Sequence, residues 1–399
     1  MGFWSLLEVA SMPVIQVLII SLGGAFMASD YCKLLTVEAR NSMNKVVFVA
    51  FAPCLMFANL AKTVTLEDIV SWWFMPVNMG LTFLIGGILG WIVVKLLKPV
   101  PYLEGLVIAA CSSGNMGNLP VILVPAICDD DKSPFGNRSV CRTVGLSYAS
   151  FSMALGGFYI WTYTFRLIKG SAVMFKAIEE SEKAALKPPN SDLESDHKSH
   201  LLDSPEGSNG LRKDFVKDEK GFWRKGLEFL HQILEELLAP PTVGAMIGFV
   251  FGAVVRLRNL IIGDNAPLRV IQDTAKILGD GTIPGMTIIL GGNLVQGLRS
   301  SAIKPPVIAG IICVRYVILP AIGICVVKTA ESLGLLPADP LFQYVLMLQF
   351  TLPPAMNIGT MTQLFNVGQD ECSVLLLWTY LVAALALTIW STIFLSLLS

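Results

Sequence analysis

The stretch GLVIAACSSGNMGNLPVILVPAIC, residues 105–128, is a hydrophobic segment that is interrupted in its middle. It is long enough to cross a bilayer, which takes about 20 residues. Glycine and proline weaken or break a helix, and an unpaired backbone at membrane depth must be buried in protein or line a cavity. We interpret the stretch as a broken membrane helix at a functional site. The alternative is a proline-kinked helix whose asparagines hydrogen-bond to neighbouring helices.

A second stretch, PLFQYVLMLQFTLPPAMNIGTMTQLFN (residues 340–366), is broken in the same way. Asn118 stands two positions before Pro120 in the first break, and Thr351 stands two positions before Pro353 in the second. A capping residue followed by proline suits the restart of a helix. Two interrupted segments at corresponding positions of two halves are typical of the binding site of a transporter.

The composition indicates a polytopic membrane protein. Of its 399 residues, 54% are hydrophobic and 15% charged, whereas soluble proteins have about 25% charged residues. The net charge of −1 gives no sign of a nucleic-acid partner. The histidines lie in or beside the polar centre of the chain, and the cysteines lack metal-ligand spacing. We therefore expect no metal, no cofactor and no enzymatic activity.

The hydropathy pattern predicts an all-α protein with ten spans. They cover residues 6–27, 46–61 (interrupted by Pro53), 72–96, 105–128, 143–168, 243–255, 277–295, 307–327, 340–366 and 374–398. Serine, proline and mixed charges dominate the stretch between the fifth and sixth spans, which cannot bury enough apolar surface to fold alone. The expected organisation is an N-terminal half (1–168), a flexible cytosolic linker (169–238) and a C-terminal half (239–399).

The prolines indicate that the two halves are repeats. Three prolines lie 40 and 67 positions apart in the first half, and three lie 43 and 69 positions apart in the second: Pro13, Pro53 and Pro120, then Pro241, Pro284 and Pro353. Five spans per half place the second half in the opposite orientation. The sequence thus predicts a 5+5 inverted repeat, related by a pseudo-two-fold axis in the membrane plane.

Ten spans put both termini on one side of the membrane and the linker on the other. The basic residues of the short loops, seven against nine, do not decide which side is cytosolic. A glycosylation sequon, Asn137-Arg138-Ser139, lies between the fourth and fifth spans and favours a lumenal or external loop. Cys128 and Cys141 bracket this loop, and an oxidising lumen would allow a disulfide, although two free thiols are the favoured alternative.

Several strings resemble the PIN-LIKES family of plants, which are auxin carriers related to the PIN auxin efflux carriers and, more distantly, to bile-acid symporters. The strings are GNMGNLPVILVPAICDD, FAPCLMFANLAKTV, WWFMPVNMGLTFLIGG and LGGNLVQGLR. The resemblance covers nearly the whole chain outside the linker. It implies that the fourth and ninth helices cross at their prolines. It also implies residence in the endoplasmic reticulum with lumenal termini, and transport of indole-3-acetic acid in intracellular auxin homeostasis.

The resemblance further implies a two-part machine. The first, second, sixth and seventh helices would form a scaffold, and the others a moving part. Auxin would bind beside the crossover, and the scaffold would pair two copies as a homodimer. The chain departs from the PIN break sequence at Met116 and Gly117, and its linker is far shorter than that of the long-loop PIN carriers.

The crossover has the chemistry to bind a carboxylate. Helices that restart after Pro120 and after Pro353-Pro354 bring two N-termini, each with roughly +0.5 charge, toward the midplane. The side chains of Asn115, Asn118 and Asn357 can donate hydrogen bonds to the anion. An aromatic ring needs an apolar slot, and its candidates, for which plain helix packing is the alternative, are Pro53, Leu55, Met56, Ile283 and Met286.

Three charged residues are candidates for counter-charge or coupling. Arg315 lies deep in an apolar run, so it is either functional or a structural partner of a broken-helix carbonyl. Lys276 and Asp280 are four residues apart and either couple to ions or protons or form a boundary salt bridge.

Three function classes compete for this chain. A channel would need a continuous polar pore, and an enzyme would need a nucleophile or metal cluster, whereas the polar residues gather at two breaks. The pattern favours a carrier. Another small organic anion is the alternative substrate, because the dipole argument identifies a carboxylate and the ring comes only from the resemblance.

Overall fold

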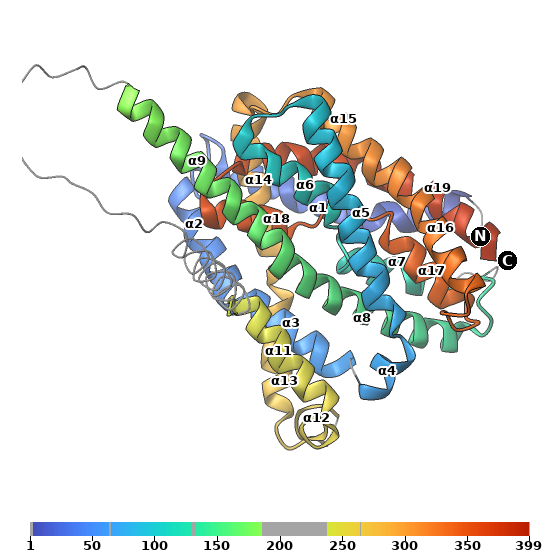
Figure 1. Ribbon diagram of the computed structural model, residues 1–399. Coiled ribbons are helices and arrows are strands. Elements are labelled where there is room, and N and C mark those ends of the chain that lie inside the picture. Colours follow the sequence, from blue (N-terminus) through green and yellow to red (C-terminus); the bar gives the residue numbers. More distant parts are fainter. Residues whose placement is uncertain (1–2, 64, 130–132, 186–237, 264, 399) are drawn as a thin grey trace, which may run out of the picture.

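The structure is a computed structural model that describes residues 3–63, 65–129, 133–185, 238–263 and 265–398. Throughout this described part, the regular elements are helices. The predicted linker (169–238) lies largely outside the described residues, although its first residues continue the helix α9 to Ala185. Figure 1 shows both termini on one side of the molecule and the end of α9 on the opposite side, as an even number of crossings would require.

The first half of the chain forms long helices joined by short connections. Two of these helices contain a π-turn, η1 or η3. The elements are α1 (Phe3–Ala28), α2 (Val37–Val46), η1 (Val47–Phe51), α3 (Ala52–Thr63), α4 (Leu66–Ser71), α5 (Phe74–Leu97), η2 (Pro101–Leu103), α6 (Glu104–Ser112), α7 (Asn118–Cys128), α8 (Arg138–Tyr159), η3 (Ile160–Thr164) and α9 (Phe165–Ala185).

The second half follows a similar order. Its elements are α11 (Pro240–Ala253), α12 (Val255–Ile261), α13 (Arg269–Asp280), α14 (Thr282–Ser300), α15 (Pro305–Cys313), η4 (Val314–Ile318), α16 (Leu319–Ser332), α17 (Pro340–Gln349), α18 (Asn357–Phe365) and α19 (Gln369–Leu398).

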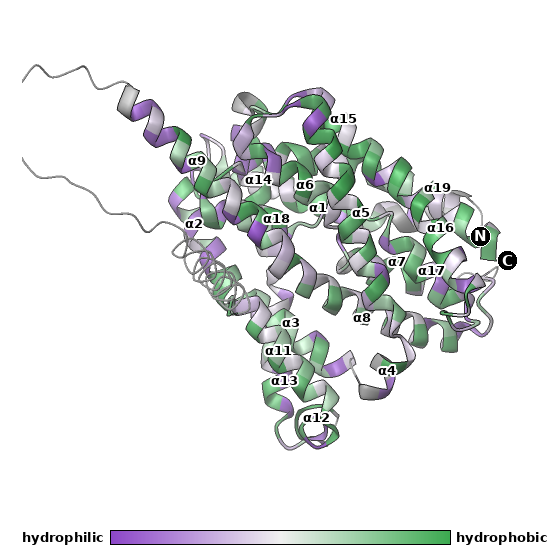
Figure 2. Ribbon diagram, viewed as in Figure 1, coloured by the Kyte–Doolittle hydropathy of each residue, from purple (hydrophilic) through white to green (hydrophobic). Residues whose placement is uncertain are grey.

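Helices long and apolar enough to cross a membrane account for only part of the predicted spans. Among the described residues, four helical stretches qualify: Val37–Thr63, Phe74–Leu97, Pro305–Ser332 and Gln369–Leu398. The bent pair α11 and α12, at 105°, makes a fifth if it is one span. Figure 2 shows hydrophobic residues along most helices. Each predicted span falls on one or two helices, but ten crossings and the inverted repeat stay predictions.

The second predicted span is not interrupted at Pro53. Helices α2 and α3 run on through η1, where the backbone N–H of Ala52 bonds to the carbonyl of Val47. Proline lacks an N–H and its ring clashes with the carbonyl four residues earlier. A π-turn just before the proline loosens the backbone bonding at that point. Pro320 likewise follows the π-turn η4.

The two breaks pair with each other at the centre of the molecule. The N–H of Asn115 bonds to the carbonyl of Pro353 (2.7 Å), and the N–H of Ala355 bonds to the carbonyl of Ser113 (2.9 Å). Gly114 and Pro354 thereby form an antiparallel bridge. These bonds satisfy backbone groups that a broken helix leaves unpaired. The breaks therefore do cross within the protein.

The crossing differs from the expectation in one respect. Pro353 and Pro354 take part in it, but Pro120 does not, because it is already inside α7. Glycine occupies the contact in the first break: a Cβ on Gly114 would lie 2.6 Å from Nη2 of Arg315. Gly114, and not Pro120, thus lies at the contact between the two breaks.

Candidate functional site

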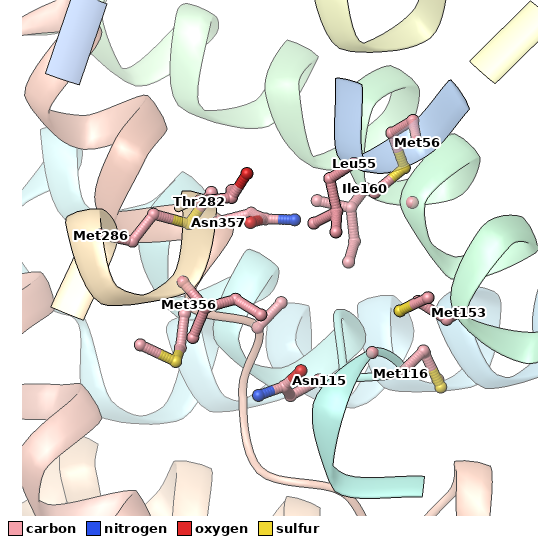
Figure 3. A pocket seen from close by; sticks show the side chains of 14 residues that line it. Leu55, Met56, Asn115, Met116, Met153, Ile160, Thr282, Met286, Met356 and Asn357 are labelled. Carbon is pink, nitrogen blue, oxygen red and sulfur yellow. The ribbon is translucent and has the colours of Figure 1, made fainter. Parts of the chain in front are cut away.

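A small cavity of about 50 Å³, partly open to the outside, lies beside the crossover. Small-molecule sites commonly enclose 300–1,000 Å³, so the cavity in this structure is narrower than a site occupied by a ligand of that size. Its walls come from α3, the first break, α8 with η3, α14 and the second break (Figure 3). The lining residues are Leu55, Met56, Asn115, Met116, Gly117, Met153, Gly157, Ile160, Thr282, Ile283, Met286, Ala355, Met356 and Asn357.

The cavity brings together six residues that the sequence singled out. They lie in four separate segments of the chain: Leu55 and Met56, Asn115, Ile283 and Met286, and Asn357. Ligand contact by these residues stays a prediction. The juxtaposition itself places two asparagine amides opposite an apolar wall, which is the arrangement expected for an aromatic acid.

The predicted prolines do not line the cavity. Pro53 instead packs on α11, where a Cβ on Gly244 would lie 2.4 Å from the carbonyl oxygen of Pro53. Pro353 and Pro354 are occupied in the backbone pairing, and Pro120 lies inside α7. Helix packing, the alternative for Pro53, is what the structure shows. The side chain of Asn118 lies outside the described residues.

Asn357 is the first residue of α18, and its amide points into the cavity (Figure 3). Its side chain makes no hydrogen bond within the described part of the chain, so it can bond a ligand. The next two N–H groups, of Ile358 and Gly359, already bond to the carbonyls of Ala355 and Met356. The N-terminus of α18 therefore has fewer free backbone N–H donors than the sequence predicts. The helix dipole and the Asn357 amide remain available to an anion.

Asn115 faces the cavity from the other break and is held by Tyr380 of α19. The Asn115 amide donates to the Tyr380 hydroxyl at 2.7 Å, and that hydroxyl donates to the carbonyl of Pro354 at 3.2 Å. Tyr380 is buried and thus ties the Asn115 side chain to the opposite break. Sequence reasoning missed Tyr380, which lies 265 residues from Asn115 and carries no local sign of this role.

The remaining walls are mostly methionine and small residues. Five methionines line the cavity: Met56, Met116, Met153, Met286 and Met356. Methionine is flexible and polarizable, and its sulfur packs favourably against aromatic rings. A Cβ on Gly157 would lie 2.5 Å from the sulfur of Met56, so this glycine makes room for it. The hydroxyl of Thr282 is buried without a partner among the described residues and is a further polar group missed from sequence.

Arg315 lies on the crossover but does not line the cavity. Its side chain is fully buried, and Nη1 donates to the carbonyls of Cys111 (3.1 Å) and Ser112 (3.5 Å). Nη2 donates to the carbonyls of Leu352 and Pro353. These carbonyls belong to the C-terminal ends of the first half-helices, where the dipole is negative. The sequence left two alternatives for Arg315, a functional role or a structural one. This geometry supports the structural role.

Lys276 and Asp280 also lie away from the cavity. Both side chains are exposed on α13, and the structure forms no ion pair between these two described residues. The boundary salt bridge expected from their spacing is therefore absent. Among the described residues that line the cavity, none is charged.

The connection between α7 and α8 contains the predicted sequon and a disulfide. Cys128 is bonded to Cys141, so the favoured expectation of free thiols was wrong. Exposed Asn137 caps α8, its side chain accepting hydrogen bonds from the N–H and hydroxyl of Ser139. The Arg138 hydrogen bond, with nearby Arg142, holds the pKa of Asp129 below its usual value.

Comparison with known proteins identifies the family. A family described as "Membrane transport protein" matches residues 9–391. Over the full length of both chains, the sequence is 80% identical to Protein PIN-LIKES 5 of Arabidopsis thaliana. The chain belongs to the PIN-LIKES family. Another PIN-LIKES relative, Protein PIN-LIKES 7 of the same plant, is 66% identical over the full length of both chains.

The family relationship settles the class of protein. An uncharacterized transporter of Saccharomyces cerevisiae is 26% identical over 94% of this chain and 92% of its own. A PIN-LIKES chain with this composition and these apolar helices is a multi-pass membrane transport protein, as the sequence predicts.

Proposed function

We propose that this protein is a carrier for indole-3-acetic acid across the membrane of the endoplasmic reticulum, working by alternating access and contributing to intracellular auxin homeostasis. The observation that supports it best is the cavity beside the crossover. There, Asn115 and Asn357 approach from the two breaks and face an uncharged wall rich in methionine. Such a site pairs polar groups for a carboxylate with a slot for a ring.

The carboxylate would bind at the polar end of the cavity. The free amide of Asn357 donates a hydrogen bond, and the N-terminus of α18 adds its positive dipole end. Hydrogen bonds to a charged group contribute about 1.5–3 kcal/mol each. The site thereby holds one negative charge without a lysine or arginine in the wall, so release does not require breaking a buried ion pair.

The ring would lie against Leu55, Ile160 and the methionine side chains. Small-molecule sites bury most of their ligand in a largely apolar cavity with a few placed polar groups. Sulfur–aromatic contacts contribute about 0.3–1.5 kcal/mol each. A rigid bicyclic acid gains from several of these at once, which favours an aromatic carboxylate over a small inorganic anion.

The position of the cavity suits alternating access. Leu55 and Met286 come from helices of the predicted scaffold, whereas Asn115, Met153 and Asn357 come from the predicted moving part. A displacement between the two groups would change the opening of the cavity while keeping the breaks together. Transporters built from inverted repeats move in this way around a central site. Pairing of two copies through the scaffold stays a prediction.

The disulfide supports the orientation that we propose. Disulfides persist in oxidising compartments such as the lumen of the endoplasmic reticulum. With Cys128 bonded to Cys141, the connection between α7 and α8 would face the lumen. The termini lie on one side and the end of α9 on the other (Figure 1), which would put the linker in the cytosol.

Uptake of labelled indole-3-acetate into sealed vesicles of known orientation tests the function. We expect saturable uptake that Asn357→Ala strongly reduces, and comparison with and without a pH gradient reports coupling to protons. An excess of a non-aromatic organic acid should compete poorly. Strong competition by that acid would favour the alternative substrate, and uptake that rises linearly with concentration and ignores Asn357→Ala would contradict the carrier.

A further inference from the structure

We propose that Gln363 is the latch of a polar route that connects the central cavity with the linker-side face of the protein. The route runs between α2, α14 and α18. The proposal rests on the proposed function only in taking the central cavity as the substrate site. In the structure the Gln363 latch is closed, and breaking it would open the cavity toward the linker side.

The route begins in a second, smaller hollow of about 10 Å³ that adjoins the central cavity. The two share Met286 and Met356 in their walls. Beyond these, the second hollow is lined by Asn293 of α14 and by Gly359 and Thr360 of α18, together with Ile289 and Leu290. It thus leads from the site along the faces of α14 and α18 toward the ends of both helices on the linker side.

Gln363 makes two hydrogen bonds beside this hollow, one of them to Asn293 in its wall. Asn293 donates to its Oε1 at 2.7 Å, and its own Nε2 donates to Oδ1 of Asn41 on α2 at 2.5 Å. Only 2% of Gln363 is exposed. Helix α18 belongs to the predicted moving part, whereas α2 and α14 belong to the predicted scaffold. Both hydrogen bonds of Gln363 therefore join the moving part to the scaffold, and both must break if the moving part separates from the scaffold there.

Other polar groups along the route have unused hydrogen-bonding capacity. Asn44 donates to the carbonyl of Thr360 at 2.9 Å, yet its Oδ1 has no partner within the described residues. The hydroxyls of Thr360 and of Thr282 are also buried and unpaired there. Buried polar groups are normally hydrogen-bonded. An explanation for this cluster is that water or the substrate carboxylate bonds to these groups when the route is open.

The route ends at an open hollow that contains a buried arginine. Arg40 directly precedes Asn41 in α2, is 6% exposed and donates to the carbonyl of Gly292 at 2.9 Å. Its Nε is unpaired among the described residues. Asp30 and Gln296 also line this hollow. The positive charge of Arg40 would draw an organic anion to the mouth of the route.

Thiol labelling tests the latch without any substrate. The six free cysteines are replaced, the Cys128–Cys141 disulfide is kept, and Met286→Cys places one thiol where the two hollows meet. A membrane-impermeant thiol reagent is added to sealed vesicles whose linker faces outward, as an epitope tag in the linker reports. Adding Gln363→Leu, which removes both hydrogen bonds, should raise the labelling rate about tenfold.

Gln349→Leu is the matched control. Gln349 is equally buried, at 1% exposed, and bridges Asn78 and Ser152, but all three belong to the predicted moving part. Its variant should leave the labelling rate within about twofold, since its bonds do not join the two groups. If Gln363→Leu labels no faster than Gln349→Leu in protein that retains its disulfide and elutes as one species, the latch is refuted.

Gly359→Leu tests the path itself. Gly359 lines the second hollow, and a Cβ placed on it would have no neighbour closer than 3.9 Å, so a side chain introduced there starts without a clash and occupies the hollow. Added to Gln363→Leu, it should return linker-side labelling to the starting rate. Labelling that stays fast would mean that the reagent reaches the thiol by another path. Loss of indole-3-acetate uptake alone, with the labelling pattern intact, would count against the substrate and not against the latch.

Discussion

At the scale of single residues, different side chains at the crossover stabilise the breaks and face the cavity. The sequence alone did not distinguish these two roles. Arg315 bonds to four carbonyls at the ends of the first half-helices and does not line the cavity. Asn115 and Asn357 face the cavity. A charged side chain stabilises the break, and neutral amides are available to the ligand. This division keeps the charge of the site low, which suits a carrier that must release its anion.

Replacing Arg315 tests this division. Arg315→Gln should lower the thermal stability of the purified protein, because each lost hydrogen bond to the guanidinium contributes about 1.5–3 kcal/mol. Folded Arg315→Gln protein should still bind indole-3-acetate more tightly than its amide. Thermal unfolding and ligand affinity measure the two effects. Loss of the anion preference with unchanged stability would make Arg315 the counter-charge of the site.

Tyr380 should act by positioning Asn115. Tyr380→Phe removes the hydroxyl between the Asn115 amide and the Pro354 carbonyl while keeping the ring. One hydrogen bond of about 1 kcal/mol corresponds to roughly a three- to tenfold loss of ligand affinity. In the Asn115→Ala background the same change should have little further effect, because the side chain it positions is gone. Equal losses in both backgrounds would mean that Tyr380 acts independently of Asn115.

At the scale of helices, the breaks were predictable and their contact was not. Glycine and proline in an apolar run signal an interruption from local sequence alone. The pairing of Gly114 with Pro354 depends on a close backbone approach in three dimensions, so Pro120 was wrongly placed at the crossing. Pro53 was misjudged for a related reason, since a π-turn accommodates it and α11 packs on it. The cavity residues on α3 and α14 were predictable because they lie next to Pro53 and Pro284.

The connection between α7 and α8 should be covalently closed and lumenal. Removing the disulfide by a Cys128→Ser and Cys141→Ser double substitution should destabilise the protein by about 3 kcal/mol, the loop-closure value for about 15 residues. Mass spectrometry of alkylated protein purified without reductant should find both thiols unavailable, and treatment with a glycosidase should shift the mobility of the wild type if Asn137 is modified. Two free thiols, with glycosylation of an acceptor placed in the linker, would reverse the orientation.

At the scale of the whole molecule, transport should reside in the two helical halves. Replacing residues 187–209 of the linker with a flexible spacer should leave vesicle uptake near the wild-type level, because that stretch is too polar to add a core. Uptake and membrane insertion are measured on the same vesicles. Normal insertion with abolished uptake would show that the linker takes part in gating.

The proposed division into a scaffold and a moving part would account for two kinds of hydrogen bond in the molecule. The crossover bonds lie within the predicted moving part, so under the proposed mechanism they would persist in each access state. The Gln363 bonds join that group to α2 and α14 and hold one state closed. Sequence could indicate a carrier from its repeats and breaks, but these contacts link residues that are 70 and 322 positions apart, and a single sequence does not reveal such pairings.

The most direct test of the account is the affinity of purified protein for indole-3-acetate and for its uncharged amide, in the wild type and in Asn357→Ala. If the amide of Asn357 binds the carboxylate, the substitution should weaken acid binding about ten- to a hundredfold, the range for a hydrogen bond to a charged group. The uncharged amide should bind weakly to the wild type and lose much less. Equal losses for acid and amide would contradict the account, because the crossover would then shape the cavity without binding the carboxylate.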